Sequence, residues 1–428
     1  MTQAFDIIIV GAGMVGAALA TGLGQQGHRV ALVERTAPEA FSENSHPDIR
    51  VSALSAGSED YLTGLGAWQH ILAMRATPYR RLGVWDDTPS VLNRLVPQNL
   101  TCVEFDAADM GASHLGHIVE NSVTQNALWQ TAGQEPDVTL FTGSGISALE
   151  QDGKQATLTL DDHQTLSAQL VVGADGARSQ IRHLAGIGVS RDEYGQQAMV
   201  ISVRYRGAPE DITWQGFQPT GPRAFLPLHS AGPDYPGESW ASLVWYDSQA
   251  CHERLMAMDD AQLMAEIQQA FPAQLPPLTH IDARASFAIA RQHATEYFQG
   301  RVVLAGDSAH TINPLAGQGV NLGFQDARCL QALLAEASRQ GTDLADPQRL
   351  HRYQSERKPA NRRMMLTMDL FYYLFSNRVP PVHLARKAGL GAARAMPFAR
   401  NRVARYAMGL EPMPLTGPGF PLSGAGQS

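Results

Sequence analysis

The chain begins with an apolar run that leads directly into a glycine-rich segment, and this pairing restricts the fold more than any other feature. Residues 5–10 (Phe-Asp-Ile-Ile-Ile-Val) have the composition of a buried strand, and Gly-Ala-Gly-Met-Val-Gly follows them. Gly11 allows a tight turn, Gly13 lets the backbone approach a pyrophosphate, and Gly16 lets the next helix pack closely on the strand. The N-terminus of that helix faces the phosphate charge. The segment therefore predicts a Rossmann-like βαβ unit that binds a dinucleotide.

The second strand of this unit is predicted at residues 29–33, and an acidic residue ends it. Glu34 lies where a carboxylate can accept hydrogen bonds from the ribose hydroxyls of an adenosine. The neighbouring Arg35 is included among the candidate cofactor contacts. FAD and NAD proteins share this half of the pattern, so it does not by itself select the cofactor.

A second glycine-bearing segment far downstream makes that selection. Residues 301–305 predict another buried strand, which ends at a Gly-Asp pair. Asp307 can bind the ribityl hydroxyls of a flavin, and Asn321 can add a side-chain hydrogen bond. The helix that begins near residue 317 directs its N-terminal dipole at the flavin ring, where negative charge gathers on reduction. The alternative is that Asp307 merely caps a helix. The candidate residues of this segment are Gly306, Asp307, Pro314, Gly317, Gly319 and Asn321.

A third segment supports the same conclusion. Residues 171–182 (Val-Val-Gly-Ala-Asp-Gly-Ala-Arg-Ser-Gln-Ile-Arg) predict a strand followed by the capped start of a helix. Asp175 and Gly176 lie at the turn between the two. Alone the pattern is common, but together with the two glycine-bearing segments it indicates an FAD protein.

The pattern along the chain predicts an α/β fold: a Rossmann-like FAD-binding domain with an inserted β-sheet substrate domain and a helical C-terminal extension. The sheet is expected where alternating, aromatic-rich strands occur, at residues 195–287. We assign residues 1–78, 106–190 and 290–345 to the FAD-binding domain, 79–105 and 191–289 to the substrate domain, 346–410 to a basic helical region and 411–428 to a disordered tail.

Helices are predicted at residues 14–26, 55–74 and 121–132. The large aromatic side chains of the inserted sheet have two explanations: they line a ring pocket, or they form ordinary sheet core. They are Trp214, Phe217, Phe225 and Trp245.

Charge is distributed unevenly along the chain. Residues 347–410 contain 13 Lys or Arg and two acids, a net charge of +11. Because the whole chain carries −8, the remainder carries −19. A basic module on an acidic body suggests an anionic neighbour, either lipid headgroups or an acidic partner. A solvated helical face explains it equally well. The acidic body argues against a nucleic-acid partner.

Several classes of protein are disfavoured. The three cysteines, Cys102, Cys251 and Cys329, have neither disulfide-framework nor metal-ligand spacing, so no metal site is predicted and a reducing cytosol is expected. No charged leader precedes an apolar stretch, so secretion is not expected. Residues 7–24 are uncharged and long enough to suggest a membrane span. Their glycines and strand-like start favour a βα turn instead.

With the three segments in place, residues 1 to about 410 resemble the single-component flavoprotein aromatic hydroxylases, relatives of p-hydroxybenzoate hydroxylase. The resemblance implies that the Gly-Asp segment binds the flavin ribityl chain and that the Asp175-Gly176 segment lies between flavin and nicotinamide. Arg50 matches a family arginine near the flavin. Asn121 stands where many members carry an Arg or Gln that touches the cofactor, and Gln125, one turn later, can substitute. FAD and NAD(P)H are the implied cofactors.

Within that family the chain is similar to the ubiquinone-biosynthesis branch, through residues 116–121 (Gly-His-Ile-Val-Glu-Asn) and 306–323. This implies ring hydroxylation of a polyprenylated quinol, 3-demethoxyubiquinol, with NAD(P)H and O₂ through a flavin C4a-hydroperoxide. It also implies a cytoplasmic protein that can meet the inner membrane or a biosynthetic complex. No catalytic acid or base is assigned. His310 and Tyr246 are candidates by residue type only.

Other functions remain open at this stage. The chain could hydroxylate another position of an earlier polyprenylphenol or of a non-isoprenoid phenol. It could be a flavin reductase or dehydrogenase without oxygenation, or a flavoprotein scaffold. Product mass separates the first two classes, because an oxygenase adds an oxygen atom from O₂. Nothing in the sequence selects NADH over NADPH or sets the oligomeric state.

Overall fold

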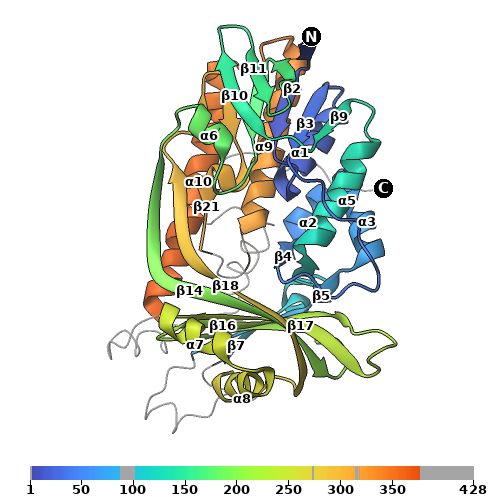
Figure 1. The fold of residues 1–428 in the computed structure, drawn as a ribbon, viewed down its shortest axis with the longest axis vertical. Helices are drawn as coiled ribbons and strands as arrows, with labels where there is room; N and C mark the ends of the chain where they lie inside the picture. The colour runs from blue at the N-terminus through green and yellow to red at the C-terminus, as the bar shows by residue number, and fades with distance from the viewer. Residues whose placement is uncertain (1, 87–101, 272–273, 314–316, 318, 376–428) are drawn as a thin grey trace.

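The computed structural model describes residues 2–86, 102–271, 274–313, 317 and 319–375 (Figure 1). The upper half in Figure 1 contains a mostly parallel sheet with helices around it, and the lower half is a broad, mostly antiparallel sheet with two helices beneath it. The predicted α/β fold with a large inserted sheet is confirmed.

The central sheet of the upper half is parallel apart from one edge strand. Its order is β19 (Phe298–Gln299), β20 (Val302–Leu304), β13 (Leu170–Gly173), β2 (Ile7–Val10), β3 (Val30–Glu34) and β9 (Val138–Thr142). Only β19 is antiparallel. All four residues of β2 are buried, as expected for a parallel strand covered on both faces. Ligands bind such sheets at the carboxyl ends of the strands.

Several helices pack around this sheet and against one another. α1 (Met14–Gly24) packs against both α5 (Asn121–Gln134) and α9 (Gly319–Gln340). The helical structure predicted at residues 55–74 is confirmed, and it consists of two helices, α2 (Ala56–Gly64) and α3 (Ala67–Met74). Gly66 adopts φ +81°, a left-handed conformation that ends one helix and starts the next.

Two small sheets flank the central one. One has the order β1 (Gln3–Ala4), β12 (Thr165–Ala168), β11 (Ala156–Leu160) and β10 (Ile146–Gln151). The other has the order β4 (Val51–Ser55), β8 (Gly116–Glu120) and β5 (Thr77–Tyr79). The short elements between the sheets are η2 (Ala107–Met110), α6 (Gln180–Leu184) and η3 (Gly306–Ser308).

The lower sheet has eight strands. Their order is β21 (His310–Thr311), β18 (Leu278–Ala294), β14 (Val189–Arg206), β17 (Glu238–Asp247), β16 (Gly221–Ser230), β15 (Ile212–Gln218), β6 (Arg81–Asp86) and β7 (Cys102–Asp106). Figure 1 shows α7 (Gln249–Ala257) and α8 (Asp260–Ala270) under one face. Trp214, Phe225 and Trp245 belong to the hydrophobic core of this sheet, which agrees with the explanation that they are ordinary sheet core.

Two strands of the lower sheet are long enough to reach the upper half. β14 has 18 residues and β18 has 17, and in Figure 1 they rise together along the side of the molecule towards α10. The end of β18 pairs with β21, through Gln292 with Thr311 and His293 with His310. The inserted sheet therefore continues directly into the segment that follows Gly306.

The last described helix is α10 (Pro347–Phe375), which packs on α9 and contains Pro359. The predicted continuation of the basic helical region beyond residue 375, the tail at 411–428, Pro314 and residues 87–101 of the predicted substrate domain lie outside the described residues. Residues 7–24 form β2 and α1 rather than a span. Within the described ranges, no helix has the length and apolar content needed to cross a membrane.

Removal of a core aromatic should destabilise the lower sheet. Phe225 is 2% exposed and packs edge-on against Tyr205 at 5.6 Å between ring centroids. We expect Phe225→Ala to lower the free energy of unfolding by about 3–5 kcal/mol, measured by urea denaturation. Leu72→Ala is the control, because Leu72 is 45% exposed and should change stability little. Equal effects would contradict this packing.

Candidate functional site

The turn after β2 combines tight packing with one open side. Gly11 has φ +97°, and a Cβ there would lie 2.5 Å from the Ala174 carbonyl oxygen. A Cβ on Gly16 would lie 1.9 Å from the Gly11 carbonyl oxygen. At Gly13, the residue before α1, a Cβ would meet nothing within 4 Å. Backbone contacts thus restrict the turn at Gly11 and Gly16, while the space beside Gly13, where α1 begins, is open.

Side chains from β3 and α5 hold this turn from both sides. The Glu34 Oε2 atom accepts a hydrogen bond from the Ala12 backbone N–H at 2.7 Å. The Gln125 Nε2 atom donates to the Ala12 carbonyl oxygen at 3.1 Å. Arg35 lies beside Gly145, with its Nη2 atom 3.0 Å from the position of a Cβ there. Sequence analysis did not foresee that Glu34 and Gln125 fix the same peptide.

The Gly-Asp pair lies at the carboxyl end of β20, two strands from Gly11. Gly306 has φ +65° and begins η3. The Asp307 side chain is exposed, yet the surrounding protein displaces enough water to raise the pKa of its carboxyl. The positive charges of His310 and Arg50 oppose that rise. The fold therefore brings Arg50, which precedes β4, into the electrostatic range of Asp307.

Contacts through Val15 join the two glycine-bearing segments. A Cβ on Gly306 would lie 3.2 Å from the Val15 Cγ2 atom, and one on Gly323 would lie 2.5 Å from it. α1 and α9 therefore approach closely at their N-terminal turns. Gly317 has φ +62°, and a Cβ there would lie 3.2 Å from the Ala53 backbone nitrogen. Gly319, the first residue of α9, faces open space.

The turn after β13 is fastened to the turn after β20. The Asp175 carboxylate accepts hydrogen bonds from the Gln180 and Ile181 backbone N–H groups at 2.7 and 3.0 Å, so it caps α6. Gly176, at φ +79°, faces open space. The Arg182 guanidinium donates to the Ser308 carbonyl oxygen at 2.8 Å and to the Ala177 carbonyl oxygen at 3.0 Å.

Gln292, which the sequence analysis missed, completes this fastening from β18. Its Nε2 atom donates to the Ala177 carbonyl oxygen at 2.6 Å and to the Asp307 carbonyl oxygen at 3.3 Å. It is only 7% exposed. A polar residue near the end of a long strand could have indicated a role for Gln292. Its hydrogen-bond partners, however, are remote in sequence and could not be predicted from it.

Two asparagines hold β4, the strand that follows Arg50. The Asn121 Oδ1 atom accepts from the Ser52 hydroxyl at 2.7 Å, and its backbone N–H donates to the Arg50 carbonyl oxygen at 2.9 Å. The Asn321 Nδ2 atom donates to the Ala53 carbonyl oxygen at 2.8 Å, and its Oδ1 atom accepts from the Ser55 N–H at 3.0 Å. Both amides therefore position backbone around the site.

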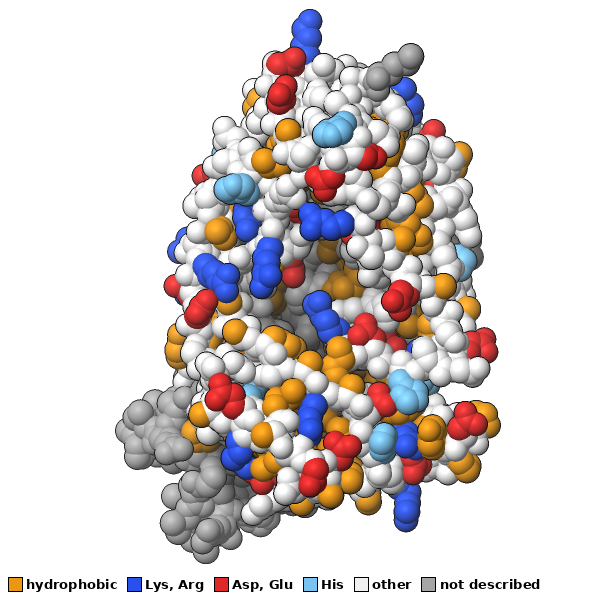
Figure 2. All heavy atoms as spheres, in the orientation of Figure 1, with side chains coloured by type: hydrophobic (Ala, Val, Ile, Leu, Met, Phe, Trp, Pro, Cys, Tyr) orange, Lys and Arg blue, Asp and Glu red, His pale blue; other side chains and the backbone are white. Residues whose placement is uncertain are grey.

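These features surround a cleft. Figure 2 shows one face hollowed at its centre, between the two halves, with basic side chains around the opening. Open space beside Gly13, Gly176 and Gly319 leaves room for a ligand at three separate turns. Two helix N-termini and an exposed carboxylate suit the phosphates and the hydroxyl groups of a dinucleotide. The residues present fit FAD.

Neither of the two acid–base candidates has an exposed side chain. His310 is 1% exposed, and its Nε2 atom lies 2.5 Å from the Asp326 Oδ2 atom. Tyr246 is 3% exposed and packs with Ala198 and Ile289. Both side chains are therefore enclosed by protein.

Comparison with known proteins identifies the family. The FAD binding domain family matches residues 4–367. The chain is 45% identical over 409 residues to 3-demethoxyubiquinol 3-hydroxylase of Escherichia coli, covering 95% of this chain and 99% of that protein. It is 34% identical to ubiquinone hydroxylase UbiL of Rhodospirillum rubrum, covering 94% and 89%. This chain belongs to the FAD-dependent hydroxylase family.

A solved structure supports the fold of this hydroxylase. p-Nitrophenol 4-monooxygenase PnpA of Pseudomonas putida superposes with a TM-score of 0.75 at 18% identity, covering 96% of this chain and 99% of that chain. The sequence-based prediction of an FAD-dependent, NAD(P)H-using ring hydroxylase is confirmed at the level of the family.

A group of potential metal ligands lies elsewhere in the hydroxylase. Among the described residues, Glu59, His114 and His117 form a group with donor atoms within 4.8 Å of one another. The two Glu59 oxygens lie 2.7 Å from His114 Nε2 and 2.6 Å from His117 Nδ1. Ligand atoms around a tetrahedral zinc ion lie roughly 3.3 Å apart. Hydrogen bonds between the three side chains therefore explain this arrangement.

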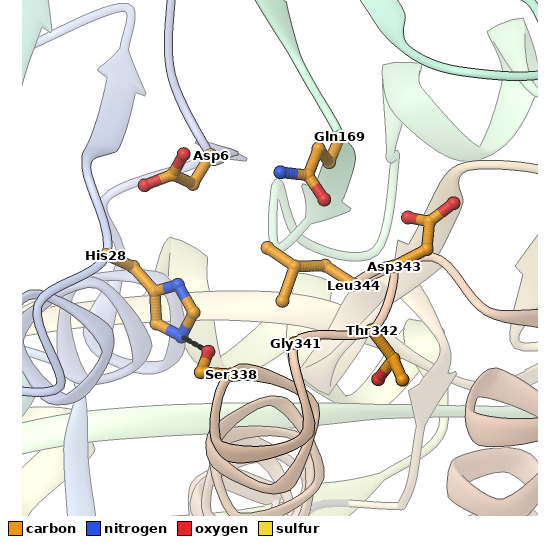
Figure 3. Close-up of a pocket in the computed structure, with 8 residues that line it drawn as sticks. All are labelled: Asp6, His28, Gln169, Ser338, Gly341, Thr342, Asp343 and Leu344. Carbon is orange, nitrogen blue, oxygen red and sulfur yellow. Dashed lines mark hydrogen bonds between the residues drawn. The ribbon is translucent and has the colours of Figure 1, made fainter.

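A separate cavity of about 380 Å³ lies away from the glycine turns (Figure 3). Asp6 and Gln169 line it, and they immediately precede β2 and β13. The cavity is thus at the amino ends of the strands, the opposite edge from Gly11 and Asp175. His28, also in its lining, contacts the Ser338 hydroxyl at 3.1 Å. This cavity is therefore not part of the candidate FAD site.

An arginine whose side chain is 10% exposed contacts both halves of the hydroxylase beside the Arg50 segment. Arg75, after α3, contacts Glu120 of β8 with its Nε atom 3.1 Å from the carboxylate. Its Nη1 atom lies 3.2 Å from the Nε2 atom of His229, on β16. Burial, together with the Arg75 charge, lowers the pKa of His229 to about 4.

This low pKa predicts a pH-dependent contribution to stability. Between about pH 6.5 and pH 4, the unfolded chain binds a proton at His229 that the folded chain does not, so the free energy of unfolding falls as pH falls. We expect His229→Asn to weaken that dependence in urea titrations. His351→Asn, at an exposed position, is the control. An unchanged pH dependence in His229→Asn would refute the prediction.

Proposed function

We propose that this enzyme hydroxylates the ring of a polyprenylated benzoquinol in ubiquinone biosynthesis, with 3-demethoxyubiquinol as substrate. The observation that carries the proposal is the 45% identity to 3-demethoxyubiquinol 3-hydroxylase across 95% of this chain. That similarity includes both the cofactor turns and the inserted sheet. The name of the Rhodospirillum rubrum relative, ubiquinone hydroxylase, supports the same class of substrate.

The placement of the turns supports a role for each of them in binding the cofactor. The backbone at Gly11–Gly16 and the N-terminus of α1 would hold the pyrophosphate, with Glu34 and Arg35 towards the adenosine. Asp307 would hold the ribityl chain, and the N-terminus of α9 would face the flavin ring. FAD, when bound, supplies hydride acceptance and oxygen activation. The chain itself must bind the ring, orient it and exclude water.

Oxygen-isotope labelling tests this proposal. Purified enzyme is incubated aerobically with NADPH or NADH and a short-tailed demethoxyquinol under ¹⁸O₂, and the product is analysed by mass spectrometry. We expect one ¹⁸O atom in the ring product, because one oxygen atom comes from O₂. A matched phenol that has a free ring position but lacks the quinol hydroxyl pattern is the control substrate.

Two outcomes of that experiment would contradict the proposal. Oxidation of the nicotinamide with hydrogen peroxide as the only oxygen product would mean that the quinol is the wrong substrate. Product without ¹⁸O would indicate a dehydrogenase, the alternative reaction class. A folded protein that retains no FAD would overturn the cofactor assignment as well.

We also propose that α10 meets an anionic membrane surface, which would give access to a lipid-soluble substrate. Three apolar residues on one face of the helix are strongly exposed: Leu366 (53%), Leu370 (58%) and Tyr373 (63%). Arg362 and Arg363, one turn earlier, are exposed too. An apolar stripe beside basic side chains is typical of helices that lie in a lipid interface.

Replacing the stripe should weaken binding to lipid. We expect the double variant Leu366→Gln/Leu370→Gln to bind vesicles of phosphatidylglycerol roughly tenfold or more less tightly, because it loses two apolar side chains from the interface. Co-sedimentation measures this. Leu72→Gln, an exposed leucine on α3, is the control. Undiminished binding of the double variant would exclude this face as the contact.

A further inference from the structure

A fully buried carboxylate lies directly behind the Gly-Asp turn. Asp326, on α9, is 0% exposed. Its Oδ2 atom accepts from the Gly306 backbone N–H at 3.2 Å and lies 2.5 Å from His310 Nε2. Its Oδ1 atom accepts from Arg357 Nε at 2.7 Å and from Asn361 Nδ2 at 3.0 Å. One oxygen thus bonds the Gly-Asp turn, which we call the cofactor turn, and the other bonds α10.

The charge of this carboxylate is compensated within the cluster. Burial raises the pKa of the Asp326 carboxyl, but the charges of His310 and Arg357 outweigh burial and hold that pKa well below its usual range. Arg357 is itself only 9% exposed. A buried carboxylate with several donors is held in one orientation, because any rotation would leave charged groups unpaired.

Further hydrogen bonds fix the α10 side of the cluster. The Arg357 Nη2 atom donates to the Asn361 Oδ1 atom at 2.9 Å, and Asn361 Nδ2 donates to the Tyr297 hydroxyl at 3.1 Å. That hydroxyl lies 2.8 Å from His293 Nε2. Burial first, and the charge of His310 second, lower the pKa of His293 to about 4, so this imidazole is neutral at neutral pH.

The cofactor side of the cluster surrounds Asp307 in sequence. Gly306 immediately precedes Asp307 and begins η3, and its φ of +65° is a left-handed conformation that favours glycine. His310 follows η3 and pairs through β21 with β18. Asp326 therefore holds the chain before and after Asp307, through Gly306 and His310. Gln292, on β18, donates to the Asp307 carbonyl oxygen.

We propose that Asp326 is a positioning residue for flavin binding: it fixes Gly306 and His310 so that the Asp307 carboxylate points into the cleft. The proposal rests on the cofactor role of Asp307 given above. Asp326 itself reaches neither cofactor nor substrate, because it is fully enclosed by protein. Its loss should release the turn and weaken FAD binding before it affects the rest of the fold.

The experiment compares two buried aspartates that both anchor α10. Asp369 is 5% exposed and pairs with Arg291 of β18 and the Tyr194 hydroxyl, and it bonds neither Gly306 nor His310. Asp326→Asn and Asp369→Asn are purified, stripped of flavin and titrated with FAD, with flavin fluorescence, the visible absorption spectrum and the melting temperature as readouts. These measurements need no quinol substrate.

We expect Asp326→Asn to raise the Kd for FAD at least tenfold and to shift the visible flavin spectrum. Asp369→Asn should lower the melting temperature while it leaves the Kd within about twofold. If Asp326→Asn does not fold, Asn361→Ala removes one donor to Asp326 and should give a smaller rise in Kd. Partial rescue by Asp326→Glu, which restores the charge, would support positioning.

Two results would overturn the inference. Wild-type affinity and an unchanged spectrum in Asp326→Asn would show that the turn does not need this anchor. An equal rise in Kd in both variants would show that general destabilisation is responsible. If the wild type binds FAD but does not hydroxylate the quinol, the substrate proposal fails while this comparison still decides the role of Asp326.

Discussion

The structure depends on the register of three parallel strands that come from distant parts of the chain. Gly173 at the end of β13 pairs with Val10 of β2 on one side and with Leu304 of β20 on the other. Because the three strands end in one row, the turns at Gly11, Asp175 and Gly306 all follow at the same edge. Each turn alone is a common strand-to-helix connection. Their alignment brings the three turns together at the edge where ligands bind in such sheets.

The inserted sheet is attached to this edge by its two longest strands. β18 runs from the core of the lower sheet to the Gly-Asp turn, where Gln292 bonds backbone from two of the three turns. A small movement of the lower sheet would therefore displace the Gly-Asp turn. This coupling is useful for a hydroxylase, because the ring of the substrate and the flavin must keep a fixed relation during oxygen transfer.

Buried charge is concentrated where the parts meet. Arg75 with Glu120 lies between the upper half and β16, and Asp326 with Arg357 lies between the Gly-Asp turn and α10. Such pairs gain little net stability over apolar packing, but they penalise any arrangement that separates the partners. They specify how the elements dock, whereas the apolar strands of the central sheet supply the driving force for folding.

The sequence by itself determined the elements, the turns and the family, because these depend on neighbouring residues: apolar runs predict strands, and glycines at 11, 13 and 16 predict the turn they form. It also placed Asp307 and Arg50 among the candidates, and the fold brings their charges together. Only the tertiary structure decided which side chains hold the turns. Glu34 and Gln125 share the Ala12 peptide, Asn321 holds β4, and Asp326 holds Gly306. These partners lie far apart in the chain, and a side chain's hydrogen bonds are set by what packs against it in space.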